Sequence, residues 1–116
     1  MKIHVEPATA QILASAGVTT LPKSVRAIAF TEAGKVIGWA GLYVDGPRLV
    51  MFGELSDRIR EEKRALVRGY RQLLAVAARL RLPVHAKPDD DVPAAKRFLE
   101  HMGFTAGPRG IYQWHR

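Results

Sequence analysis

The side chains best suited to chemistry are concentrated in residues 58–81. This segment carries eight arginine or lysine residues against two glutamates, which accounts for six of the seven net positive charges of the 116-residue chain. A block of this kind attracts polyanions, so the candidate partners are a nucleic acid, a membrane surface or a small phosphorylated cofactor. The alternative is a solvated helix face, because the stems of Arg and Lys cover apolar surface well. The basic residues are Arg58, Arg60, Lys63, Arg64, Arg68, Arg71, Arg79 and Arg81.

Other reactive side chains lack the neighbours that their chemistry requires. The chain has no cysteine, which excludes disulfides, cysteine nucleophiles and thiolate metal sites. Its four histidines show no metal-ligand spacing, so we expect no metal. Its serines lack the flanking glycines of a nucleophile elbow, which argues against a hydrolase triad. These residues are His4, His85, His101 and His115, and Ser15, Ser24 and Ser56.

Length and composition indicate one domain, residues 1–116, with a core of its own. With 47% hydrophobic residues and no low-complexity run or repeat, the chain is globular in character. Its apolar stretches are far shorter than the ~20 residues that span a bilayer, and residues 1–7 lack an apolar secretory region. We therefore expect a soluble cytoplasmic protein with no membrane partner.

The first half of the chain predicts a short helix and an antiparallel meander. Residues 2–5 are extended, and residues 7–16 form a short helix. Three strands follow, rich in β-branched and aromatic residues, at 25–31, 36–44 and 48–55. The turns between them are too short for a parallel crossover, so the three strands pair antiparallel.

The second half of the chain changes to a helical period. Apolar residues recur in steps of four and three from residue 59 to 82, which predicts one long helix with an arginine face opposite its apolar stripe. Pro83 ends this helix, and residues 84–86 form a short strand. Gly69, within the helix, is interpreted as a position of close packing. The stripe consists of Leu66, Tyr70, Leu73, Ala77 and Leu80.

A second, shorter helix follows. Apolar residues recur at helical steps from Ala95 to Met102, and Gly103 supplies the left-handed residue that ends the helix. The acidic run 89–91 precedes this helix, where carboxylates favour its positive end. Residues 110–115 alternate between polar and apolar types and form the last strand of the sheet.

Residues 92–104 resemble the C-terminal signature of the GNAT superfamily of N-acetyltransferases, commonly written N-x-x-A-x-x-L-Y-e-k-x-G-F. Val92 stands in place of the asparagine, and Leu99 in place of the tyrosine that is often the general acid. The resemblance covers about residues 25–115, and residues 1–24 are shortened relative to the family. The residues in register with the signature are Ala95, Phe98, Glu100, Gly103 and Phe104.

The resemblance implies an α/β (α+β) fold. We expect a central mixed sheet that begins with an antiparallel meander, one long helix, and one short C-terminal helix. A strand begins at Phe104, directly after the short helix. Compact chains of this type also resemble proteins encoded by bacteriophages.

The resemblance also implies a site for acetyl-CoA at the start of the long helix. In the family, a loop of pattern Q/R-x-x-G-x-G/A presents backbone amides to the pyrophosphate, and here Arg64 and Leu66 stand at the glycine positions. Either basic side chains replace the glycine cradle and clamp the phosphates, or the cofactor site is lost. Glu61 and Glu62 would repel a phosphate at this place. The clamp would consist of Arg58, Arg60, Lys63 and Arg64.

Further implied roles lie at the end of the strand at 48–55. Pantetheine would pair there like an extra strand with the backbone of Glu54, Leu55 and Ser56. Glu54 stands where some members of the family carry a glutamate that acts as general base on the substrate amine, directly or through water. Because Leu99 replaces the tyrosine, no conventional acid for the leaving thiolate is visible.

Three functions compete on these observations. The first is an acetyl-CoA-dependent N-acetyltransferase that acts on a small-molecule or protein amine. The second is a GNAT-like module without catalytic activity, which binds a partner or self-associates as a homo-oligomer through the sheet or the C-terminal strand. The third is nucleic-acid binding through the arginine helix, although no aromatic interleaving or recognised motif supports it.

Overall fold

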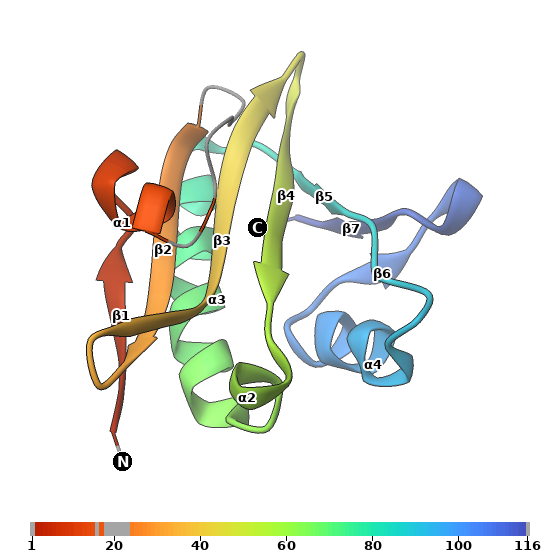
Figure 1. The fold of residues 1–116 in the computed structure, drawn as a ribbon. Coiled ribbons are helices and arrows are strands. Elements are labelled where there is room, and N and C mark those ends of the chain that lie inside the picture. Colours follow the sequence, from red (N-terminus) through yellow and green to blue (C-terminus); the bar gives the residue numbers. More distant parts are fainter. Residues whose placement is uncertain (1, 16, 18–23, 116) are drawn as a thin grey trace.

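The computed structural model describes residues 2–15, 17 and 24–115, with Ser24 and Val25 described through their backbone alone. The chain forms a seven-stranded sheet flanked by helices (Figure 1). A short 3-10 turn at Pro108–Gly110 precedes the last strand. The elements are β1 (Ile3–Pro7), α1 (Ala10–Ser15), β2 (Ser24–Glu32), β3 (Lys35–Asp45), β4 (Arg48–Leu55), α2 (Asp57–Arg60), α3 (Lys63–Leu80), β5 (Val84–Ala86), α4 (Pro93–His101), β6 (Thr105–Ala106) and β7 (Tyr112–Trp114).

The sheet is mixed, as the sequence predicts. Its strand order is β1-β2-β3-β4-β5-β7-β6, and every neighbouring pair is antiparallel except β4 and β5. The meander of β2, β3 and β4 is confirmed, because two-residue turns leave no room for a crossover. Strand β5 follows the long helix, which provides the crossover that a parallel pair requires.

Strands β4 and β5 pair over a very short distance. Only Leu49 with Val84 and Val50 with His85 are in register, although β4 continues to Leu55. On its other side, β5 pairs along its whole length with β7. Figure 1 shows β4 and β5 close together at one end and diverging toward α2 and α4. Beyond these two residue pairs, β4 and β5 are therefore not paired with each other.

The long helix predicted for residues 59–82 is in fact two helices. Ser56 caps α2 by accepting a hydrogen bond from the Ile59 backbone N–H, and the Ile59 side chain is fully buried. Glu62 then leaves the helical region with φ −107° and ψ 72°, and α3 begins at Lys63. The apolar period continues across this break, so the pattern alone does not reveal it. Helix α3 ends at Leu80, and the next residue, Arg81, adopts a left-handed conformation two residues before Pro83.

The N-terminal helix is also shorter than predicted. Pro7 is the last residue of β1, where it lies opposite Ile28, and α1 begins at Ala10. The side-chain oxygen of Thr9 accepts a hydrogen bond from the backbone N–H of Ile12, which marks the start of the helix. The predicted end at residue 16 lies outside the described residues.

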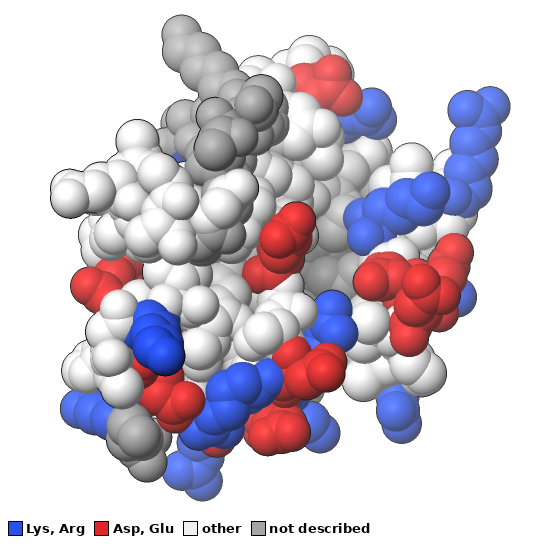
Figure 2. Space-filling model, viewed as in Figure 1, with Lys and Arg blue, Asp and Glu red and all other residues white. Residues whose placement is uncertain are grey.

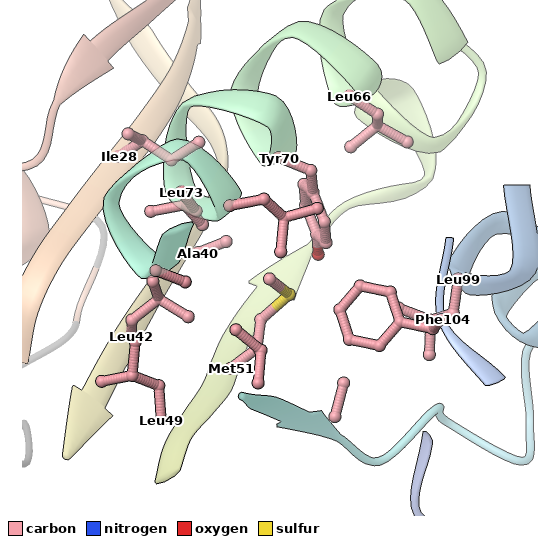
Figure 3. Packing of buried hydrophobic residues seen from close by; sticks show 14 of the residues in the cluster. Ile28, Ala40, Leu42, Leu49, Met51, Leu66, Tyr70, Leu73, Leu99 and Phe104 are labelled. Carbon is pink, nitrogen blue, oxygen red and sulfur yellow. The ribbon is translucent and has the colours of Figure 1, made fainter. Parts of the chain in front are cut away.

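The main core lies between α3 and the sheet (Figure 3). The predicted stripe on α3 is buried at four of its five positions, but Leu80 is 46% exposed because it lies at the end of the helix. Opposite the stripe, the strands supply apolar side chains that alternate with outward-facing residues. The fully buried strand residues include Phe30, Ile28, Leu42, Leu49 and Val84.

Gly69 brings α3 close to β2, which confirms the close-packing interpretation. A Cβ atom at this position would lie 2.6 Å from two ring atoms of Phe30 and 2.7 Å from Cδ1 of Ile28. Both side chains are at most 2% exposed, so neither can move aside into solvent.

None of the helices within the described ranges is both long enough and apolar enough to cross a membrane.

We expect Gly69→Ala to lower the free energy of unfolding by about 1–3 kcal/mol, which is the usual cost of overpacking a core. Helix propensity alone would have the opposite effect, because it favours Ala over Gly by about 1 kcal/mol in a helix. Urea unfolding followed by circular dichroism measures the effect. A second substitution, Phe30→Leu, makes room for the added methyl group, so it should cost less in the Gly69→Ala background than in the wild type. A Gly69→Ala protein as stable as the wild type would contradict the expectation.

Candidate functional site

A groove opens where β4 and β5 diverge. Its volume is about 770 Å³, within the range of sites that hold small molecules and cofactors. One wall is β4 and the start of α3, and the other is the loop after β5 together with α4. Figure 2 shows this side of the molecule, on which basic and acidic side chains both gather around the hollow beside β4. The apolar lining includes Met51, Leu55, Leu66, Val67, Phe98 and Leu99.

The edge of β4 that faces the groove is unpaired. The backbone N–H of Leu49 donates to the carbonyl oxygen of Pro83 at 2.8 Å, so this residue directs its backbone toward β5. Alternate residues of a strand share this direction, and they include Gly53 and Leu55. Strand β5 does not extend to either of them. Their backbone groups therefore face the groove without a strand partner, although such groups normally require one.

Gly53 is needed for this edge to stay in the sheet. A Cβ atom on Gly53 would lie 2.2 Å from the carbonyl oxygen of Trp39 and 2.7 Å from Cα of Ala40, both on β3. A side chain would therefore push β4 away from β3.

The start of α3 forms the mouth of the groove. No side chain caps this helix, because Glu62 makes no capping hydrogen bond, so the first backbone N–H groups of α3 lack a side-chain acceptor. Lys63 and Arg60 line the groove at this end. The positive end of the helix dipole and these two cations favour an anion here.

Two further cations, Lys87 and Arg97, line the opposite wall. The charge pattern of the sequence does not indicate them, because they lie outside the basic segment 58–81 and come from the loop after β5 and from α4. Glu54 and Asp89 are the acidic residues of the lining. Basic side chains thus outnumber acidic ones around the groove.

The structure separates the predicted site residues into two groups. Glu54, Leu55, Arg60 and Lys63 line the groove, and Ser56, Arg58 and Arg64 do not. The hydroxyl group and the backbone N–H of Ser56 both donate to the carbonyl oxygen of Ile37. Arg64 is exposed on the surface of α3.

Arg58 is held in an ion-pair cluster. Its guanidinium group donates to both carboxylate oxygens of Glu32, at 3.0 and 2.6 Å, and to Glu62 at 2.5 Å. The hydrogen bond from Arg58 lowers the pKa of Glu32, and its carboxylate partners raise the pKa of Arg58 above its ordinary value. The cluster ties α2 to the end of β2. The cluster also includes Glu61 and Glu62, at which the sequence predicts repulsion of a phosphate. Neither of these two residues lines the groove.

An exposed carboxylate and two aromatic rings lie close together on β3 and β4. Glu54 is exposed and lies directly opposite Trp39 of β3. The rings of Trp39 and Phe52 meet edge to face with centroids 5.4 Å apart. Nε1 of Trp39 is the one fully buried side-chain nitrogen or oxygen atom in the described part of the chain that has no hydrogen-bond partner.

Tyr70 and Phe98, which both line the groove, connect its two walls. Tyr70 of α3 and Phe98 of α4 meet edge to face, with ring centroids 5.0 Å apart and an interplanar angle of 84°. Burial raises the pKa of Tyr70 to about 12, and the positive charge of Arg60 opposes this increase. Leu99, at the position of the family's tyrosine, is buried and lines the groove with an apolar side chain.

No group of three or more His, Asp or Glu side chains within residues 2–15, 17 and 24–115 is close enough to hold a metal ion.

The sequence matches no protein-family model, and a comparison with curated proteins finds no significant match. Solved structures do match. An acetyltransferase of the GNAT family from Staphylococcus aureus Mu50 superposes with a TM-score of 0.64 at 13% identity, over 78% of this chain and 66% of that protein. The chain spans 63% of the length of a second match, a ribosomal-protein-serine acetyltransferase candidate from Vibrio cholerae, with a TM-score of 0.56 at 15% identity.

Another structure matches over the whole length of both chains. It is the E. coli protein YhhK, provisionally assigned as an N-acetyl transferase and solved bound to coenzyme A, with a TM-score of 0.60 at 12% identity and 100% coverage of each chain. These likenesses confirm the GNAT-like fold of this chain. In this molecule the fold comprises the mixed sheet, the diverging pair of central strands and the helix at the mouth of the groove.

Outside the groove, His85 of β5 makes the stability of the protein sensitive to mild acid. Nη1 of Arg48 lies 3.3 Å from its Nδ1, and burial followed by the charge of Arg48 lowers the pKa of His85 below 6.5. Between its folded pKa and 6.5 the unfolded chain binds more protons than the folded one. The free energy of unfolding therefore falls as the pH is lowered through this window.

We expect His85→Gln to reduce the loss of stability between pH of about 7 and about 5.5, because the variant removes the group that titrates in this window. Urea unfolding at both pH values measures the difference. His101→Gln, on the exposed side of α4, is the matched control and should lose as much stability as the wild type. An identical loss in the wild type and in His85→Gln would show that His85 does not cause it.

Proposed function

We propose that this chain is an acetyl-CoA-dependent N-acetyltransferase that acts on the amine of a small molecule or a protein. The observation that carries this proposal is the groove, which joins an unpaired central strand edge to an uncapped helix start with cations on both walls. When bound, acetyl-CoA supplies an acetyl group activated as a thioester. The residues of the groove fit the three chemically different parts of that molecule.

The basic mouth of the groove suits the phosphates. Arg60 and Lys63 lie beside the first backbone N–H groups of α3, so side-chain and backbone donors can share one anion. Lys87 and Arg97 provide charge on the opposite wall. The arginine and lysine side chains thus replace the glycine-rich loop, with Arg58 and Arg64 outside this set.

The free edge of β4 suits the amide groups of the pantetheine arm. Backbone N–H and C=O groups of Gly53 and Leu55 pair with an extended chain in the way that a neighbouring strand would. These contacts depend on the backbone direction and tolerate different side chains. The apolar lining excludes water from the arm.

Glu54 is the residue proposed to accept the proton of the amine. It lines the groove beside Gly53, and its carboxylate is exposed, so an amine can approach it from solvent. The proton passes directly or through one water molecule. Positioning of the amine against the acetyl group provides the rest of the rate acceleration.

A GNAT-like module without catalytic activity is the second candidate. The observation that favours it is Leu99, a buried apolar residue at the position of the family's usual acid. Such a module would show no acetyl transfer, whether or not it retains the groove for a ligand. Its partner would be a second copy of the chain or another protein.

We expect calorimetric titration to show saturable binding of acetyl-CoA, which Arg60→Ala, Lys63→Ala, Lys87→Ala and Arg97→Ala each weaken about 5- to 10-fold through the loss of one charged contact. Arg64→Ala and Arg79→Ala are matched controls, because they remove charge from α3 outside the groove. Both should leave the dissociation constant unchanged.

Two outcomes would overturn parts of this proposal. The absence of binding heat with millimolar acetyl-CoA would exclude the enzyme and leave the second candidate. Equal losses in the groove variants and in the controls would mean that net charge, and not the groove, attracts the ligand.

A further inference from the structure

The narrow end of the groove is formed by Met51, Tyr70 and Ala86. Pairing of β4 with β5 ends at Val50 and His85, and the next residue of each strand, Met51 and Ala86, lines the groove. Because the strands diverge from this point, the groove is narrowest here. Tyr70 is the last residue of α3 in the lining, and seven residues of helix, roughly 10 Å, separate it from Lys63 at the mouth.

The side chain of Tyr70 is directed into this end. Figure 3 shows it extending from α3 toward Met51 and Phe104, with its oxygen atom leading. The edge-to-face contact with Phe98 fixes the ring from the side of α4. The hydroxyl group therefore has a defined position.

The hydroxyl group is also available as a donor. Tyr70 lines the groove, and its oxygen is not among the fully buried side-chain atoms of the described residues that lack a partner. Both observations agree with a hydroxyl group that opens on the groove. Tyr70 is also the one residue with a hydroxyl group in the described lining.

The thioester must lie toward this end of the groove. The phosphates of acetyl-CoA require the cations at the mouth, and the pantetheine arm follows β4 away from them. The four steps along the strand from Leu55 to Met51 span about 13 Å of extended backbone. The sulfur atom then arrives where the lining is apolar except for the hydroxyl group of Tyr70.

We propose that the hydroxyl group of Tyr70 donates a hydrogen bond to the sulfur atom of the thioester and stabilises the thiolate that leaves. This inference rests on the proposed function and assigns to α3 a contact that Leu99 of α4 cannot make.

The step balances without a further reactant. The amine nitrogen attacks the thioester carbon, the carbon–nitrogen bond forms and the carbon–sulfur bond breaks, and sulfur retains the electron pair. The amine proton passes to Glu54 or to water. The phenol keeps its own proton, because a pKa of about 12 lies well above the ~8.5 of an ordinary thiol. Tyr70 thus acts as a hydrogen-bond donor, and the thiolate is protonated later by water.

The test measures the pKa of the thiol group of bound coenzyme A, which requires no knowledge of the acceptor. Coenzyme A labelled with carbon-13 at the carbon bonded to sulfur is titrated by NMR in complexes with the wild type, Tyr70→Phe and Tyr112→Phe. Tyr70→Phe keeps the ring and its contact with Phe98. Tyr112→Phe is the matched control, since Tyr112 is a buried tyrosine outside the groove. The charged groups that line the groove are the same in all three proteins, so their effects cancel in the comparison.

We expect the pKa of the bound thiol to be about one to two higher in Tyr70→Phe than in the wild type, which is what one hydrogen bond to a charged group contributes. The Tyr112→Phe complex should match the wild type. At a pH of about 6, where the thiol is protonated, both variants should bind coenzyme A with dissociation constants within about twofold of the wild-type value. Equal thiol pKa values in the wild type and Tyr70→Phe, with coenzyme A bound to both, would overturn the role of Tyr70 and leave the proposed function standing. A wild-type protein that binds neither acetyl-CoA nor coenzyme A would overturn both.

Discussion

The candidate site depends on one interruption, the end of pairing between β4 and β5 after two residues. An unpaired strand edge in the middle of a sheet is costly, because its backbone groups must find water or a ligand. Here β5 is only three residues long and is held by β7 on its far side, so it cannot follow β4. The contact of Tyr70 with Phe98 joins the helices on either side of the opening. The groove is therefore a consequence of how the strands of the sheet pair.

The basic block of the chain is divided among different tasks by the fold. Arg58 bonds to Glu32 and Glu62 and fixes α2, and Arg68 donates to the carbonyl oxygen of Ile3. Arg60 and Lys63 lie at the groove. Charge along the sequence identifies an anion-binding tendency, but the electric field at the groove also depends on cations from α4 and the loop before it.

This chain shares a GNAT-like fold with structural neighbours although only 12% to 15% of the residues are identical. The kind of contacts that build the groove explains how the fold tolerates such different sequences. A strand edge and a helix start offer backbone groups, which any sequence with the right pattern supplies. Positions at which the backbone lies very close to a neighbouring element accept only glycine, and Gly53 and Gly69 are two such positions. The same reasoning explains how the family's glycine loop can be absent while the groove is present.

The sequence by itself determined the meander, the apolar stripe of α3, the strand at β5 and the short helix α4 that Gly103 follows. Each of these follows from turns or periodicities that span a few neighbouring residues. Only the tertiary structure decided the break between α2 and α3, because the backbone leaves the helical region at Glu62 while the apolar period continues across it. It also decided which cations face the groove and where the hydroxyl group of Tyr70 points, because these positions are set by packing between elements that are distant in sequence.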